Sequence, residues 1–160
     1  MIRVLIIDDH AAVRGELAAC LAEDPAFAIV ATLAGVDEAL RCLAMARPHV
    51  VLVDHGPPLL DGIQACSTLL RRRSNLRVIV MTSAPRQAVA LAAFDAGAAG
   101  VVVKGGPPAL LRSAVRSVAA GGTSIDPSVA GPLVRLAIAA GIATSASAVA
   151  SESEVPGVVP

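Results

Sequence analysis

The chain has no tryptophan or tyrosine, only two phenylalanines, and no excess of charge, because 13 basic residues stand against 13 acidic ones. A dedicated nucleic-acid-binding domain usually carries a clear basic excess, so the composition does not favour that class. The local basic run Arg71 to Arg73 is typical of a solvated helix end, with a partner-binding patch as the second interpretation. Because 55% of the 160 residues are apolar, the chain can bury the core of one domain.

Cysteines and long apolar runs are also scarce. Cys20, Cys42 and Cys66 lie in separate apolar segments and form no C-x-x-C pair, which is typical of buried thiols in a reducing cytosol. The uncharged stretch from Leu136 to Ala150 is shorter than the roughly 20 residues that a bilayer crossing needs. The first apolar run ends at Asp8 with no signal-peptide cleavage site. We therefore expect a cytoplasmic protein without membrane contact.

Short β-branched runs alternate with segments of helical periodicity along the chain. The predicted strands are 4–7, 27–33, 50–53, 76–81 and 101–103, and the predicted helices are about 13–21, 36–43, 62–70, 86–96 and 107–118. Five strands alternating with five helices indicate an α/β fold, with a five-stranded parallel sheet and helices on both faces.

The pattern changes after Gly122. Asp126 or Ser124 could cap one further helix, and the chain then becomes rich in alanine and serine. Too little apolar bulk remains there for a second core. The sequence therefore predicts a main domain over residues 1–122, a linker helix over 123–143 and a flexible tail over 144–160.

Polar side chains follow four of the predicted strands. They are Asp8 and Asp9, Asp54, Thr82 and Lys104. Because the carboxyl ends of parallel strands meet at one edge of a sheet, these groups should lie close together. Three carboxylates repel one another unless a cation is bound, and oxygen ligands suit Mg²⁺. An aspartate can also attack a phosphoryl group, with a lysine and a metal ion stabilising the transferring oxygens.

The same residues lie in motifs that follow one another over residues 1–122. In chain order the motifs are Ile6-Ile7-Asp8-Asp9-His10, Val51-Leu52-Val53-Asp54, Pro58, Asp61-Gly62, Thr82 and Val103-Lys104. In order and spacing they resemble the CheY-like receiver domain of bacterial two-component response regulators. Three further segments resemble the LuxR-type (NarL/FixJ-like) transcriptional regulators: Ala96 to Gly100, Ala119 to Gly122 and Asp126 to Val129.

The resemblance implies a flavodoxin-like, doubly wound sheet with strand order 2-1-3-4-5. It also implies that Asp54 accepts a phosphoryl group from a histidine kinase in a Mg²⁺-dependent reaction. Asp9 would bind the metal directly, Asp8 mainly through water, and Asp54 and the carbonyl of Gly56 would complete the protein ligands. The chain would be no enzyme beyond its own phosphorylation and dephosphorylation.

Two more site residues have implied roles. Lys104 would pair with the phosphoryl oxygens, and Thr82 would turn its hydroxyl toward the phosphate on activation. Phosphorylation would switch the surface that a partner or effector recognises. In this family, such a switch commonly controls transcription. A homodimer is possible, since receivers often pair through the fourth helix, fifth strand and fifth helix.

The sequence departs from the receiver pattern at several positions. Gly56 and Ala84 lack side chains that tune phosphoaspartate hydrolysis, so an altered lifetime is expected. Val101 stands where the family commonly has an aromatic ring that reports the position of the threonine hydroxyl. These departures favour a phosphate-independent pseudo-receiver that acts as a protein-interaction module, whereas Asp54 and Lys104 favour phosphorylation.

An aspartyl phosphatase and a dinucleotide-binding domain find less support in the sequence. Phosphatases with an aspartyl nucleophile commonly place a second acid two residues later, where this chain has Gly56, and no G-x-G-x-x-G follows the first strand. A LuxR-type helix-turn-helix domain needs roughly 60 further residues. We therefore interpret the chain as a regulator lacking that domain, with DNA as a partner only if the full protein carries it.

Overall fold

The computed structural model describes residues 1–141, in which strands and helices alternate. The strands are β1 (Ile2–Ile7), β2 (Phe27–Leu33), β3 (Val50–His55), β4 (Arg77–Thr82), β5 (Gly100–Val103) and β6 (Ser124–Ile125). The helices are α1 (Ala11–Ala22), α2 (Val36–Ala46), α3 (Gly62–Arg72), α4 (Gln87–Asp95), α5 (Pro108–Ala119) and α6 (Pro127–Ala139). None of these helices combines the length and apolarity that a membrane crossing needs.

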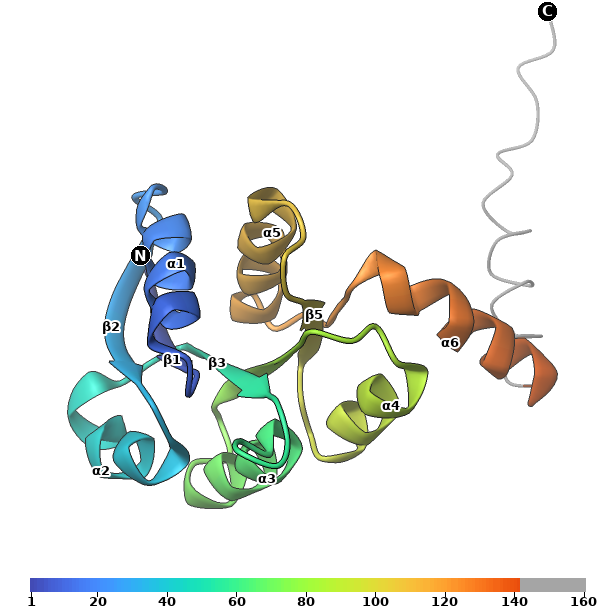
Figure 1. Cartoon of the computed structure of the whole chain (residues 1–160), viewed down its shortest axis with the longest axis horizontal. Coiled ribbons are helices and arrows are strands. Elements are labelled where there is room, and N and C mark those ends of the chain that lie inside the picture. Colours follow the sequence, from blue (N-terminus) through green and yellow to red (C-terminus); the bar gives the residue numbers. More distant parts are fainter. Residues whose placement is uncertain (142–160) are drawn as a thin grey trace, which may run out of the picture.

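All strands are parallel and lie in the order β2-β1-β3-β4-β5-β6. Figure 1 shows α1 and α5 on one face of the sheet, α2, α3 and α4 on the other, and α6 beyond β5 beside α4. The predicted α/β fold and the order of the first five strands are confirmed. The sheet has six strands instead of five, because β6 pairs with β5 past Gly122.

Side chains along each central strand alternate between two apolar clusters. In β3, Val51 and Val53 join the cluster under α2, α3 and α4, whereas Val50 and Leu52 join the cluster under α1 and α5. All four are fully buried, which explains why this strand reads as an unbroken apolar run. Asp54 is two residues after Leu52 and therefore points to the same face of the sheet, so a polar group lies where this apolar cluster ends.

Helix α3 begins very close to the end of β3. A Cβ added at Gly62 would lie 2.4 Å from the main-chain oxygen of Asp54, so this approach requires glycine. Asp61 caps the helix, since its Oδ1 accepts hydrogen bonds from the backbone N–H groups of Ile63 (3.1 Å) and Gln64 (3.0 Å). The residues after Asp54 thus turn back at once and pack against its backbone.

A helix, α6, lies within the segment predicted to be a linker helix, but the chain first adds β6. A two-residue strand carries too short a pattern to be seen in the sequence. Of the two predicted caps, Asp126 is the N-cap of α6, and Val129 is the buried residue through which the helix joins the core. The predicted tail over 144–160 lies outside the described residues.

The Gly62 contact gives a stability prediction. Gly62→Ala should lower the free energy of unfolding by about 1–3 kcal/mol, because the added methyl group overlaps backbone that cannot move freely. Gly15→Ala is the matched control: this exposed position inside α1 has no atom within 4 Å of an added Cβ. It should raise the stability by about 0.5–1 kcal/mol through helix propensity.

Urea denaturation followed by far-UV circular dichroism measures both changes in a chain without tryptophan. Equal effects of the two substitutions would contradict the close approach at Gly62.

Candidate functional site

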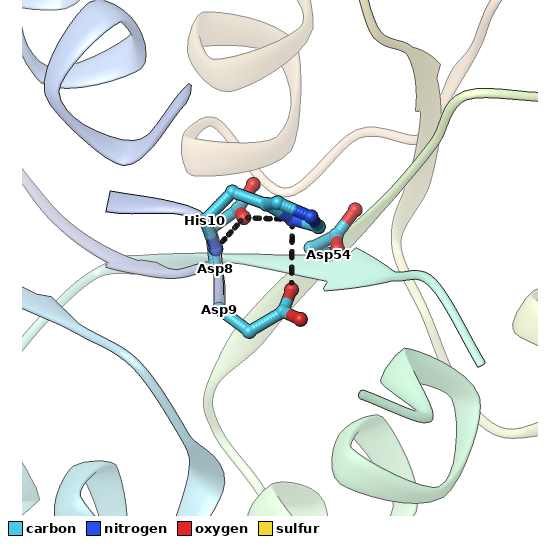
Figure 2. Close-up of side chains that lie close together, drawn as sticks. All are labelled: Asp8, Asp9, His10 and Asp54. Carbon is cyan, nitrogen blue, oxygen red and sulfur yellow. Dashed lines mark hydrogen bonds and ion pairs between the residues drawn. The ribbon is translucent and has the colours of Figure 1, made fainter. Parts of the chain in front are cut away.

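The ends of β1 and β3 bring their acidic side chains together. Asp8, Asp9, His10 and Asp54 each offer one ligand atom, and these atoms all lie within 4.8 Å of one another. Figure 2 shows these side chains close together near the end of β3, with the ring of His10 beside the carboxylates of Asp8, Asp9 and Asp54. Asp8 is fully buried and Asp54 is 2% exposed, so neither carboxylate is freely hydrated.

Lys104 supplies the positive charge of the cluster from the end of β5. Its Nζ lies 2.6 Å from Asp54 Oδ1 and 2.5 Å from Asp8 Oδ2. Its backbone N–H donates to the carbonyl of Thr82 at 2.8 Å, which ties the end of β5 to the end of β4. One ammonium group thus joins the carboxylates of Asp8 and Asp54, and it contacts Asp54 through Oδ1.

The two acidic residues that follow β1 have different contacts. Asp8 is fully engaged: its Oδ1 accepts from the N–H of His10 at 2.9 Å, its Oδ2 from Lys104, and its main-chain oxygen from Arg14 at 2.5 Å. Asp9 Oδ1 is buried and accepts no hydrogen bond within the described chain, although His10 Nδ1 lies 3.2 Å away. A buried carboxylate oxygen without a donor fits a cation ligand.

The charges of Asp54 and Lys104 depend on each other. Burial raises the pKa of the Asp54 carboxyl, and Asp8 and Asp9 raise it further, so the hydrogen bond and charge of Lys104 offset only part of the shift. Burial alone would lower the pKa of Lys104, but hydrogen bonds and attraction to Asp54 and Asp8 outweigh it and raise that pKa. Lys104 therefore stays charged, and a cation would favour ionised Asp54.

Position 56 lies beside the oxygen of Asp54 that Lys104 does not bind. A Cβ added at Gly56 would lie 3.1 Å from Asp54 Oδ2, so glycine leaves this side of the carboxylate open. The Gly56 N–H donates to the carbonyl of Leu60 at 2.9 Å, and the Leu60 N–H donates to the carbonyl of Gly56 at 3.3 Å. That carbonyl retains a second lone pair for another partner.

A family model for the response regulator receiver domain matches residues 4–116. The chain belongs to the response regulator receiver domain family. It is 37% identical over 134 residues to the DNA-binding transcriptional activator DevR/DosR of Mycobacterium tuberculosis, covering 84% of this chain and 62% of the relative. It is 32% identical over 134 residues to the transcriptional regulatory protein LiaR of Bacillus subtilis, covering 84% and 64%.

Solved receivers have the same fold. A two-component response regulator of the LuxR family from Aurantimonas matches with a TM-score of 0.80 and 31% identity, covering 85% of this chain and 97% of that one. The isolated receiver domain of RcsB from Salmonella enterica, solved with the phosphomimetic BeF3−, matches with a TM-score of 0.70 and 26% identity, covering 80% and 95%. The likeness to LuxR-type regulators is confirmed, while the chain spans less than two thirds of the length of those two curated relatives.

Thr82 of the receiver is buried, and its hydroxyl is bonded to the residue two positions later in the chain. Its hydroxyl donates to the carbonyl of Ala84 at 3.1 Å and accepts from the Ala84 N–H at 3.2 Å. It is thus part of its own loop at the end of β4, and the structure joins it to Lys104 through its main-chain oxygen rather than its hydroxyl.

No role for His10 or Arg14 follows from the sequence, whereas His55 is interpreted from it as an incidental loop residue, with a neighbour that shifts charge at the site as the alternative. His10 and Arg14 come to Asp8 because α1 begins immediately after β1. His55, which follows Asp54, has a buried Nδ1 without a hydrogen bond in the described chain, 3.6 Å from Asp61 Oδ1. A histidine beside a motif aspartate is a signal for such contacts, but the direction of each ring depends on the tight turns after β1 and β3.

The burial of Asp54 predicts a pH effect on stability. Because its folded pKa is raised above the unfolded value of about 3.9, its contribution to stability is fully present below about pH 3.9 and is lost as the pH rises through the folded pKa. In chelator, Asp54→Asn should therefore gain stability relative to the parent as the pH rises from about 3.9 through the folded pKa.

Urea denaturation near the unfolded pKa of about 3.9 and at neutral pH, with Asp37→Asn as the exposed control, measures this difference. A stability difference between Asp54→Asn and the parent that does not shift in favour of Asp54→Asn as the pH rises would contradict the raised pKa.

Proposed function

We propose that this receiver accepts a phosphoryl group on Asp54 from a histidine kinase in a Mg²⁺-dependent reaction. The observation that carries the proposal is the pairing of the buried Asp54 carboxylate. One oxygen is held by Lys104 at 2.6 Å, while the other faces the open side at Gly56, next to Asp8 and Asp9. A nucleophile needs such an oriented, accessible oxygen.

In the proposed transfer, Asp54 Oδ2 attacks the phosphorus atom of a phosphohistidine. A P–O bond forms, the P–N bond breaks, and the leaving imidazole takes up a proton. The ammonium group of Lys104, which pairs with Asp54 beforehand, then also contacts the phosphoryl oxygens. It balances the negative charge that these oxygens carry during the transfer. Hydrolysis of the acyl phosphate returns the carboxylate and releases inorganic phosphate.

The residues at the site fit a magnesium ion. Asp9 Oδ1 is a buried oxygen without a donor, the Asp54 carboxylate lies in the same cluster, and the carbonyl of Gly56 has a lone pair available. Both carboxylate oxygens of Asp8 already accept hydrogen bonds, which supports contact through water. When bound, the ion would neutralise the acidic cluster and polarise the transferring group.

We further propose that Thr82 exchanges its hydrogen bonds to Ala84 for one to the phosphoryl group. The Thr82 hydroxyl has both bonds within its own loop, so this exchange breaks no contact to another element. The resulting rearrangement of the β4–α4 loop would alter a partner or effector surface.

The wider role is inferred from the relatives. DevR/DosR is named a DNA-binding transcriptional activator, and RcsB, 26% identical to this chain, has been solved as dimers bound to DNA. We propose that the receiver acts in the cytoplasm in transcription control and can pair with a second copy. DNA contact would belong to the part of the longer relatives that this chain does not cover.

The first test is the intact mass of the protein after incubation with Mg²⁺ and acetyl phosphate. The parent should gain one phosphoryl group, whereas Asp54→Ala and a chelator-treated parent should gain none. Lys104→Ala should label more slowly, since it removes the charge that balances the transferring oxygens.

A parent that gains no mass while a known receiver is labelled in parallel would contradict the phosphoacceptor role. The chain would then be better described as a phosphate-independent interaction module.

The open side at Gly56 predicts the effect of a small side chain there. Gly56→Ala should slow both labelling and hydrolysis several-fold, because its methyl group would lie against Asp54 Oδ2. Mass spectrometry of labelling and of decay after gel filtration measures both rates. Gly106→Ala is the matched control, since an added Cβ there lies 3.6 Å or more from its neighbours, and a change of the same size in both variants would contradict the steric argument.

A further inference from the structure

We propose that Asp126 is a positioning residue that couples the Asp54 site to helix α6. The coupling rests on the proposed phosphorylation of Asp54. Its structural basis is one buried carboxylate that bonds both the end of β5, directly beside Lys104, and the first turn of α6.

The two oxygens of Asp126 bind different elements. Oδ2 accepts a hydrogen bond from the backbone N–H of Val103 at 2.9 Å. Oδ1 accepts from the backbone N–H of Ser128 at 3.0 Å and from its hydroxyl at 2.7 Å. Burial alone would raise the pKa of Asp126, but these hydrogen bonds outweigh it and hold that pKa below its usual range, so the carboxylate is ionised at neutral pH. Hydrogen bonds to a charged acceptor are stronger than neutral ones.

The hydrogen bond from Val103 N–H to Asp126 takes the place of a backbone hydrogen bond between β5 and β6. Ser124 N–H donates to the carbonyl of Ala99 and Asp126 N–H to that of Val101, both at 3.0 Å. β6 ends at Ile125, and the side chain of Asp126 takes the next β5 donor, Val103 N–H. A displacement of the end of β5 therefore acts directly on the carboxylate that caps α6.

The other end of this connection is the reactive site. Lys104 follows Val103, and its Nζ binds both Asp54 and Asp8. When Asp54 carries a phosphoryl group, Lys104 must share its charge with the new oxygens, and in the proposed coupling this change shifts the adjoining backbone at Val103.

Helix α6 is poised to respond to its cap. Gly131 and Pro132 lie inside it, and both lower intrinsic helix stability. Val129 is its fully buried residue, while Val134 and Ile138 are 56% and 60% exposed. With such limited packing, the order of α6 depends strongly on the Asp126 cap.

Position 101, where the family commonly has an aromatic ring, is poorly suited in this chain to carry a signal from the phosphorylation site to α6. Val101 is fully buried in the same apolar cluster as Val129, and it pairs with Val80 and Ile125 in the sheet. A valine side chain has few rotamers and is short, so it cannot change its position as a large aromatic ring can. Asp126 gives the chain a polar route from the site to α6.

Hydrogen exchange of the α6 amides, measured by mass spectrometry on the full chain, tests the coupling. Exchange is compared with and without Mg²⁺ and acetyl phosphate, and the intact mass of each sample gives the loaded fraction independently. In the parent, loading should change α6 exchange by about fivefold or more, the lower range of typical coupling between sites.

Two variants separate coupling from capping. Asp126→Ser keeps a good N-cap residue, but its short hydroxyl cannot also serve Val103, so the response to loading should be lost while Asp54 still labels. Ser128→Ala keeps the Val103 bond and should keep the response. In Asp126→Ser/Pro132→Ala the helix regains an N–H donor and stays formed, and the response should still be lost.

A mere stability effect would shift α6 exchange equally with and without loading, so the difference between the two states is decisive. Labelling without any α6 change in the parent, or an unchanged response in both Asp126→Ser variants, would overturn the coupling alone. A parent that does not label would overturn the phosphoacceptor role and the coupling together.

Discussion

The structure depends on one electrostatic constraint: three carboxylates meet at one edge of the sheet, and a single ammonium group holds two of them. Lys104 lies within 2.6 Å of Asp54 and Asp8, and both acids are almost completely buried. Removing charges from water is unfavourable unless each has a partner. Lys104 satisfies part of that need, and the remaining negative charge of Asp8, Asp9 and Asp54 favours a cation beside these carboxylates.

These charged side chains meet because successive side chains of a strand alternate between the two faces of the sheet. Each of the three charged residues comes two positions after a residue of the apolar cluster under α1 and α5, and therefore points to the same side of the sheet. The pairs are Ile6 and Asp8, Leu52 and Asp54, and Val102 and Lys104. Each strand therefore delivers its polar residue in the same layer, at the end where a parallel sheet opens. The tight start of α3 against Asp54, which only a residue without a side chain at position 62 allows, then fixes the loop that shapes the open side of the site.

The central strands and the residues at their ends could be predicted from the sequence, because buried parallel strands give apolar runs and the site residues follow these runs directly. Strand β6 could not, since two residues carry no periodicity. Nor could the sequence show that Asp126 serves Val103 as well as α6, that Arg14 reaches back to Asp8, or that Thr82 faces Ala84. These contacts depend on side-chain direction in turns, whereas strands follow from pattern. The roles of the site residues in phosphoryl transfer stay predictions.

Val101 shows how a departure from a family pattern can be accommodated by the fold. On the sequence alone, valine at this position weakens the case for a switch, because it cannot swing as an aromatic ring does. In the structure the position is sealed within the cluster that also contains Val129 of α6, so a large moving ring would compete with the packing of that helix. A chain that adds β6 and α6 next to β5 thus gains from a small residue at 101. It then needs another contact between the site and the added helix, and the carboxylate of Asp126 lies where that contact would be most direct.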